Sequence, residues 1–259
     1  MLVRQAELSS EALKILTSGQ ALALHIPTYH SPEHCEQIAD SVIQRLHNGY
    51  QRIYESNVRA FTETRGNELE QRRYLDDPAS VMATVRASCL PLASPVDRLR
   101  CELDELWPGG ARLLRLDSQA LVFGMVRVWR KGSQALPHLD VLQHSVPNLR
   151  HHETFDEQIG VNIYLRMPQD LEGKEGTLEM WNLGLPDEKS IGSAKWGTYG
   201  YRRELLPDPD VSIRPEAGDL IMLRTTRLHA VHPTRTGERI SLSGFMGHSS
   251  PQAPLRLWS

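Results

Sequence analysis

The chain has 259 residues, 40% of them hydrophobic and 24% charged, an ordinary globular composition with enough length to bury a sizeable core. Its 29 Lys and Arg residues against 32 Asp and Glu give a net charge of −3, which argues against nucleic acid or an anionic membrane as a partner. No apolar run approaches the roughly 18 residues of a membrane-spanning helix. The first residues lack the apolar core of a secretion signal, and three cysteines without C-x-x-C spacing predict reduced thiols. We therefore expect a cytoplasmic protein.

The first 118 residues are predicted to be mostly helical. A short apolar strand at 21–27 leads into a helix within 31–49, and a second helix covers 94–107. Each helix opens with a Ser-Pro pair, in which serine suits the N-cap and proline suits the first helical position. Between the two helices, residues 51–80 are polar and stay unassigned, as a loop with a short helix or as a segment that reaches over an active site.

The second half is predicted to consist of short strands separated by turns. Such a pattern is typical of an antiparallel sandwich or barrel, here with helices supplied by the first part. The segment 183–210 interrupts it and is rich in Gly, Pro and charge, as lids and binding loops often are. We expect one domain over residues 1–259, with the β core at 119–247. The apolar runs lie at 120–129, 160–165, 176–182, 218–223 and 239–246.

The sequence P-H-L-D contains a His and an Asp with one residue between them, His138 and Asp140. On a strand, residues i and i+2 point to the same side, so both side chains could meet one ion. Two histidines and one carboxylate form the facial triad of non-haem Fe(II) oxygenases. This interpretation requires a second histidine downstream, and the candidates are His144, His151, His152, His229, His232 and His248.

One later stretch supplies that histidine. His229 lies in L-H-A-V-H-P after an apolar strand, and Arg239 follows ten residues on. Here the chain resembles the Fe(II)- and 2-oxoglutarate-dependent oxygenases of the prolyl 4-hydroxylase-like kind. An aromatic residue, a glycine and P-H-x-D, then H-x-V-x-P and a basic residue, make up the matching pattern. It is carried by Trp129, Gly132, Pro137, His138, Asp140, His229, Val231, Pro233 and Arg239.

The resemblance implies a double-stranded β-helix (a jelly-roll, cupin-like core) with N-terminal supporting helices. It also implies that Fe(II), 2-oxoglutarate and O₂ are used. Iron would be bound by His138, Asp140 and His229. Arg239 would hold the distal carboxylate of 2-oxoglutarate, aided by Ser241 and Tyr164.

Several residues keep a second interpretation. Ser241 could simply be a polar strand position, and Tyr164 could be an aromatic core residue. His232 competes with His229, but an odd offset on a strand turns the two rings to opposite faces, and only His229 gives the H-x-V-x-P match. His144 shares the parity of His138 and could reach the site, although we expect it on a solvated loop.

The carboxylate of Asp140 also bears on the reaction. Halogenases of this superfamily have a small residue at that position, so we expect hydroxylation, or another oxidation such as desaturation. The predicted substrate is a small molecule, such as an amino acid or a natural-product intermediate. The alternatives are a protein (prolyl-type) hydroxylase and a non-catalytic metal-binding barrel. The negative charge disfavours nucleic-acid demethylation. Neither the substrate nor the oligomeric state follows from the sequence.

Overall fold

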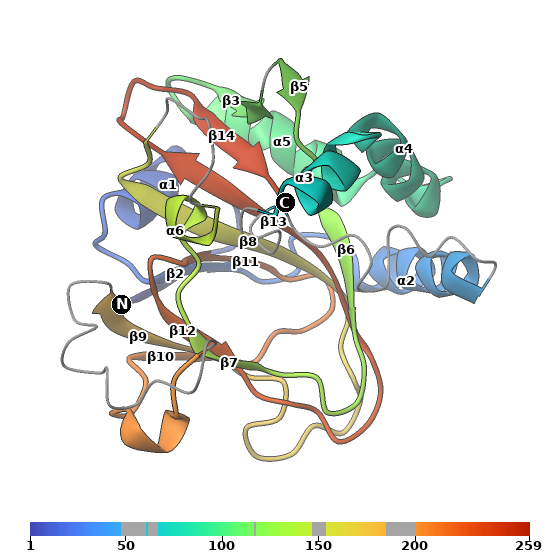
Figure 1. The fold of residues 1–259 in the computed structure, drawn as a ribbon. Coiled ribbons are helices and arrows are strands. Elements are labelled where there is room, and N and C mark those ends of the chain that lie inside the picture. Colours follow the sequence, from blue (N-terminus) through green and yellow to red (C-terminus); the bar gives the residue numbers. More distant parts are fainter. Residues whose placement is uncertain (48–60, 62–66, 117, 147–153, 185–199) are drawn as a thin grey trace.

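The computed structural model describes residues 1–47, 61, 67–116, 118–146, 154–184 and 200–259. Two β-sheets face one another, and the helices gather around the larger one (Figure 1). Its strands are β1 (Leu2–Arg4), β2 (Ala23–Ile26), β3 (Ala111–Leu113), β6 (Met125–Trp129), β8 (Glu157–Arg166), β11 (Leu220–Arg224), β13 (Arg239–His248) and β14 (Leu255–Trp258). The smaller sheet consists of β7 (Ala135–His138), β9 (Leu178–Gly184), β10 (Val211–Ile213) and β12 (Arg227–Val231).

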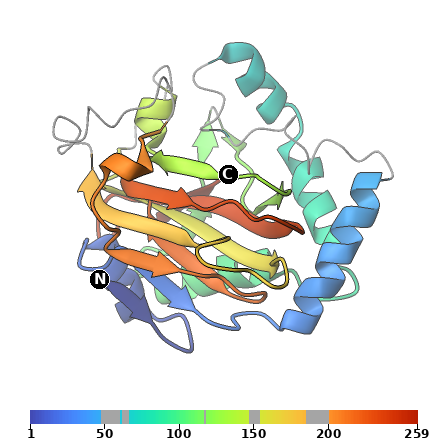
Figure 2. The same ribbon diagram turned by 90° about the horizontal axis from the view of Figure 1, so that it is seen from below.

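The order of the large sheet is β1-β2-β11-β8-β13-β14-β3, with β6 also paired to β13, and that of the small sheet is β10-β9-β12-β7. A separate hairpin joins β4 (Arg115–Leu116) to β5 (Gln119–Ala120). Most neighbours are antiparallel, so the predicted sandwich is confirmed. The view from below in Figure 2 shows the strands of the two sheets overlapping, with the long blue helix of residues 32–47 along one side of them. The helices are α1 (Ser10–Thr17), α2 (Pro32–His47), α3 (Glu68–Leu75), α4 (Pro78–Cys89), α5 (Pro95–Leu106) and α6 (Leu142–Ser145), with a 3-10 turn η4 (Arg203–Leu205).

Helix α5 shows how the local sequence sets an element. The Ser94 side chain accepts a hydrogen bond from the backbone N–H of Asp97, Pro95 occupies the first turn, and the Asp97 carboxylate lies at the positive end of the helix. Leu99 and Leu103 are four residues apart and are both buried against the large sheet. Burial of each such leucine contributes about 1.5–3 kcal/mol to stability. The predicted start of this helix is confirmed.

Alternation along β8 separates two apolar layers. Ile159, Val161, Ile163 and Leu165 pack with α1, α2 and α5 in the main core, while Tyr164 joins a second cluster between the two sheets. Because β8 lies between β11 and β13, this alternation fixes which side chains of the central strands face the space between the sheets. On β13 the inner set is Arg239, Ser241, Ser243 and Phe245, since Ile240, Leu242 and Met246 belong to the main core.

The described part of the first 118 residues holds helices α1 to α5, and it also completes the large sheet. Strand β2 pairs antiparallel with β11 and parallel with β1. The unassigned segment contains α3 and the start of α4, whereas residues 48–60, which include the end of the helix expected within 31–49, lie outside the described residues. All three cysteines are free. Among the helices that the structure describes, none has both the length and the apolar character needed to cross a bilayer.

Candidate metal centre and co-substrate site

Two strands of the small sheet bring His138 and His229 face to face. His138 ends β7, His229 lies in the middle of β12, and the two are paired directly in the antiparallel register. Their ring centroids are 4.2 Å apart. Asp140 follows two residues beyond the end of β7, and one ligand atom from each of the three residues lies within 4.8 Å of the others. The structure therefore brings together the three residues predicted as metal ligands.

Backbone hydrogen bonds orient both imidazoles. The Nδ1 atom of His138 lies 2.7 Å from the carbonyl oxygen of Leu136, and that of His229 lies 3.0 Å from the carbonyl oxygen of Arg227. A carbonyl oxygen only accepts, so each Nδ1 carries a proton, and in the neutral form of either ring the lone pair lies on Nε2. Both Nε2 atoms face the same carboxylate oxygen of Asp140, at 3.5 and 3.6 Å. Histidines that bind metal ions through Nε2 show this arrangement.

The charges of the cluster explain its protonation. Burial acts to raise the pKa of Asp140, but the charge and hydrogen bonds of His138 and His229 outweigh it and hold that pKa far below its usual range. Burial lowers the pKa of His229, and the neighbouring His138 lowers it further. For His138, burial is outweighed by the Asp140 carboxylate, which raises the pKa. The cluster thus keeps an ionised carboxylate beside a neutral imidazole, as a divalent cation requires.

Asp140 is held by the backbone of two other strands. Its N–H donates to the carbonyl oxygen of Thr225, at 2.9 Å, and the Thr225 N–H donates to the carbonyl oxygen of Gln158 on β8. The Gln158 side chain then accepts a hydrogen bond from the backbone N–H of Leu142, at the start of α6. The backbone of Asp140 is therefore tied to the large sheet, although the residue follows a strand of the small sheet.

A short segment, residues 200–206, supports the ligand strands from behind, and we call it the strap. The Tyr201 N–H donates to the carbonyl oxygen of Pro137, the residue before the first histidine. Tyr201 also packs in a buried cluster with Leu228 and Ala230, the two neighbours of His229. Leu139, between the first two predicted ligands, packs against the same cluster. The strap thus fixes both histidine strands through residues that alternate with the ligands.

Arg239 opens β13 and points between the sheets. Its guanidinium carbon lies 4.0 Å from the centroid of the Trp129 ring and 5.9 Å from that of Tyr164. Only 7% of Arg239 is exposed, its Nε has no hydrogen-bond partner, and within the described part of the chain no carboxylate forms an ion pair with it. Burial lowers its pKa, opposed by Tyr164. A buried guanidinium that lacks a carboxylate partner of its own is suited to bind a carboxylate ligand.

Comparison with known proteins identifies the family. The family model of the 2OG-Fe(II) oxygenase superfamily matches residues 123–247, which include all the residues of this site. The matched part of the chain, residues 123–247, belongs to this superfamily. The prediction of the family from the two histidine motifs is confirmed, and the protein is an oxygenase of a family that uses Fe(II), 2-oxoglutarate and O₂. No curated protein matches the sequence.

Solved structures extend the likeness beyond the matched residues. One is an N-substituted L-amino acid dioxygenase from Burkholderia ambifaria AMMD, with a TM-score of 0.63, 15% identity, and 96% of this chain and 91% of that chain covered. Another is HygX from Streptomyces hygroscopicus with iron bound, with a TM-score of 0.52, 16% identity, and 93% and 87% covered. At these identities the likeness concerns the fold, and it confirms the predicted jelly-roll core with supporting helices.

Ser241 and Tyr164 stand opposite one another in the oxygenase, paired in register on β13 and β8. Both are buried and both belong to the inner face of the large sheet. Ser241 lies two residues after Arg239 on β13, and Tyr164 is its partner on β8. The Ser241 hydroxyl lies 3.0 Å from that of Ser243. Burial raises the pKa of Tyr164, so its phenol stays protonated. Both side chains share the guanidinium's face of the sheet, and no hydrogen bond within the described residues joins either of them to it.

The other candidate histidines of the oxygenase lie elsewhere. His232 Nε2 is 3.0 Å from a carboxylate oxygen of buried Glu179, and its Nδ1 accepts from Arg203 of the strap, so this histidine fastens the strap rather than joining the cluster. His144 is exposed on α6, and His248 is at the far end of β13. His151 and His152 lie outside the described residues, as does most of the expected lid, 185–199.

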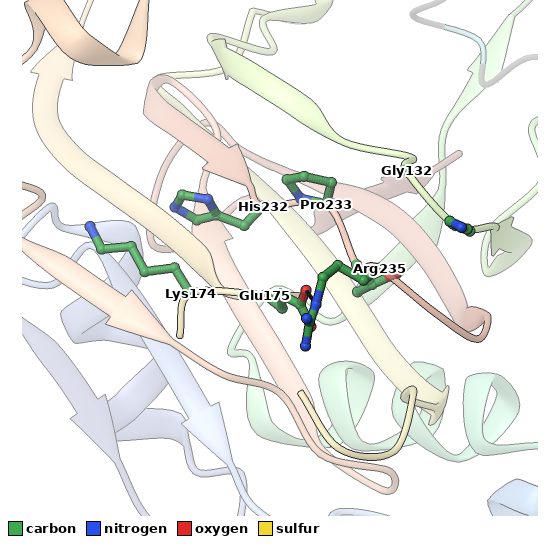
Figure 3. Close-up of a pocket in the computed structure, with 8 residues that line it drawn as sticks. Gly132, Lys174, Glu175, His232, Pro233 and Arg235 are labelled. Carbon is green, nitrogen blue, oxygen red and sulfur yellow. Dashed lines mark hydrogen bonds and ion pairs between the residues drawn. The ribbon is translucent and has the colours of Figure 1, made fainter. Parts of the chain in front are cut away.

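Figure 3 shows a hollow that does not coincide with the predicted site. It lies among the loops that follow β6, β8 and β12, and its charged groups mostly pair with acidic neighbours, Arg235 with Glu175 and Lys174 with Glu179. None of the three clustered ligand residues lines it. We therefore assign it no ligand. Its lining consists of Lys131, Gly132, Lys174, Glu175, His232, Pro233, Thr234 and Arg235.

Some residues of the site escaped the sequence analysis. Thr225 and Gln158, which hold Asp140, and Asn162 with Ser243 on the inner face of the large sheet were not singled out. Strand parity could have found two of them, because Asn162 lies two residues before Tyr164 and Ser243 two after Ser241. No sequence signal could have found the other two, since they act through the backbone contacts of strands far apart in the chain.

Proposed function

We propose that this oxygenase hydroxylates an unactivated C–H bond of a small molecule, with Fe(II) and 2-oxoglutarate as cofactor and co-substrate. The observation that carries the proposal is the donor set: two imidazoles whose Nε2 atoms face one ionised carboxylate, together with a buried guanidinium that lacks a carboxylate partner among the described residues. Such a set suits Fe(II), which accepts two histidines and a carboxylate and keeps further positions for ligands.

In this proposal His138, Asp140 and His229 hold the metal ion, and Arg239 binds the distal carboxylate of 2-oxoglutarate through its planar fork. Ser241 and Tyr164 line the same end of the space and add hydroxyl groups to that carboxylate. When bound, the metal with 2-oxoglutarate and O₂ would supply oxidative decarboxylation to succinate and CO₂, coupled to hydroxylation of the substrate.

The protein's own contribution is to orient these groups and to exclude water. The carbonyl oxygens of Leu136 and Arg227 keep both imidazoles in the ligand tautomer. The stacked Trp129 ring covers the guanidinium and fixes its plane. Because Arg239 is desolvated before the ligand arrives, its attraction to a carboxylate is little screened.

Retention of a carboxylate at position 140 favours hydroxylation, or a related oxidation such as desaturation, over halogenation. Product analysis with chloride in excess tests this point, since a chlorinated main product would contradict it. The role of the ligands is tested by His138→Ala and Asp140→Ala. Both should abolish 2-oxoglutarate turnover, and intact turnover in either variant would overturn the metal assignment.

For the substrate, an amino acid or an N-substituted derivative is the first choice. The support is the fold likeness to the dioxygenase from Burkholderia ambifaria, whose name specifies N-substituted L-amino acids, together with a chain of net charge −3 that does not suit nucleic acid. The expected place of action is the cytoplasm. The deciding experiment is a screen of N-substituted and free amino acids for succinate formation above the uncoupled background, with a proline-containing peptide as the protein-hydroxylase arm.

A further inference from the structure

Two neighbouring side chains in the middle of the large sheet are partly exposed although both strands are central. Asn162 on β8 and Ser243 on β13 are paired in register. Strand β8 is flanked by β11 and β13, and β13 by β8 and the strands β6 and β14, so neither can be reached from a sheet edge. Their outer faces are buried against helices. The exposure must therefore come from the inner face, which looks toward the small sheet and its histidines.

The position of Asn162 along β8 places it between the two halves of the site. Tyr164, two residues on, shares the co-substrate end with Arg239. Gln158, four residues back, holds the segment that carries Asp140 and α6. All three side chains follow the same parity of the strand. A molecule seated over Asn162 would thus lie between the guanidinium and the metal ligands, or directly beside them.

Hydrogen bonding fixes what Asn162 presents to that space. The Ser243 hydroxyl donates to the Asn162 carbonyl oxygen Oδ1, at 2.7 Å. Its only hydrogen is then used, so without 2-oxoglutarate the contact of 3.0 Å between the two serine hydroxyls has Ser241 as donor, and the Ser241 hydrogen turns to the co-substrate carboxylate when that is bound. The Asn162 Nδ2 group keeps both N–H donors, and among the described residues none accepts from it. The hydrogen bond from Ser243 therefore holds the Asn162 amide so that its two N–H groups face a space that solvent reaches.

We propose that Asn162 is a substrate-binding residue, whose amide donates to a carbonyl or carboxylate oxygen near the carbon to be oxidised. Ser243 is the positioning residue that holds the amide in this orientation. The inference rests on the proposed function, because it assumes that the substrate enters the space between the sheets. It narrows the substrate class to molecules with an acceptor oxygen close to the reacting C–H bond, which acylated amino acids and free amino acids both satisfy.

The test compares Asn162→Leu with Asn182→Leu, a control at an exposed asparagine on β9. Affinities are measured by calorimetry on the Mn(II)-loaded protein without O₂, first for 2-oxoglutarate and then for the compound that the screen identifies. We expect Asn162→Leu to weaken substrate binding roughly 10- to 100-fold while the 2-oxoglutarate affinity stays within about twofold. The Asn182 variant should match the parent in both, and thermal melting checks that each variant is folded.

Two further variants define the chemistry. Asn162→Asp replaces the two N–H donors of the amide by a negatively charged acceptor. It should therefore lower the affinity for an anionic substrate more than Asn162→Leu does. Ser243→Ala should give a smaller loss, because the amide remains but is no longer held. Unchanged substrate affinity in Asn162→Leu, or parent-like affinity in Asn162→Asp, would overturn the inference.

A loss confined to 2-oxoglutarate would also overturn the assignment, by showing that the acceptor belongs to the co-substrate. The proposed function fails separately, if the parent protein forms no succinate with any compound. Failure of the inference alone leaves that turnover intact, so the two results are distinguishable.

Discussion

Replacing Arg239 by methionine removes the charge assigned to 2-oxoglutarate and leaves an apolar chain against Trp129. In the ligand-free protein this guanidinium is desolvated and its Nε is unpaired. The desolvation of such an ion costs several kcal/mol by typical values of about 3–5, whereas a cation–π contact returns roughly 0.5–2 kcal/mol. We therefore expect the variant, with Mn(II) but without co-substrate, to melt no lower than the parent protein.

When 2-oxoglutarate is bound, the parent protein should melt at a higher temperature than Arg239→Met. At a 2-oxoglutarate concentration of about 100 Kd, the parent gains about 2.7 kcal/mol. With roughly 2–4 °C per kcal/mol for a chain of this size, the melting temperature should rise by roughly 5–11 °C. Arg239→Met should lose this rise entirely. Arg239→Lys keeps the charge but not the fork, so it should bind roughly 10- to 150-fold more weakly, the equivalent of one charge-assisted hydrogen bond.

The assay is thermal unfolding with Mn(II), with and without 2-oxoglutarate, followed by circular dichroism. Arg112→Met, at an exposed arginine on β3, is the matched control and should keep the full shift. A shift that survives in Arg239→Met would mean that the distal carboxylate is held by another group. A ligand-free variant that melts several degrees below the parent would refute the argument from desolvation.

Three further predictions concern other parts of the molecule. In the native protein N-ethylmaleimide should modify Cys101 alone, because the other two thiols are buried with pKa values raised to about 12 and about 11; labelling of all three before unfolding would contradict this. Since Asp140 raises the pKa of His138, a proton competes with the metal, and Mn(II) affinity measured by calorimetry should fall as pH falls through that raised pKa, whereas a flat profile would contradict it. Arg203→Ala removes one partner of buried Glu179 and should lower the free energy of unfolding in urea by about 1–3 kcal/mol; no change would mean that the strap is held without it.

The sequence could predict that His138, Asp140 and His229 lie together, because their spacing along the chain can be recognised without a structure. A His and an Asp two residues apart, and a second histidine ten residues before an arginine, are local patterns on separate strands. Their meeting depends on one fact that the pattern could not give, the direct pairing of His229 with His138 between β12 and β7. The preference for His229 over His232 agrees with this register, since strand parity separates the two rings.

Other features could not be predicted, for physical reasons that differ. Helix α3 buries only Tyr74, so its apolar periodicity is too weak to mark a helix. The strap packs through Tyr201 against strands that lie far away in the sequence, and no local signal encodes such contacts. From the sequence, Ser241 is a single polar residue on a strand. In the structure it belongs to a chain of hydrogen bonds that runs from Ser241 through Ser243 to Asn162.

The pairing of β2 with β11 affects how the enzyme can be dissected. The family match covers residues 123–247, yet β11 pairs with β2 along nearly its whole length, and β13 pairs with β14 through Phe245, Met246 and Gly247. A fragment trimmed to the matched residues would leave β11 as a bare edge with five buried residues uncovered, which is a known route to aggregation. Expression trials, domain fusions and chimaeras should therefore carry the first thirty residues and the last strand, although neither contributes a ligand.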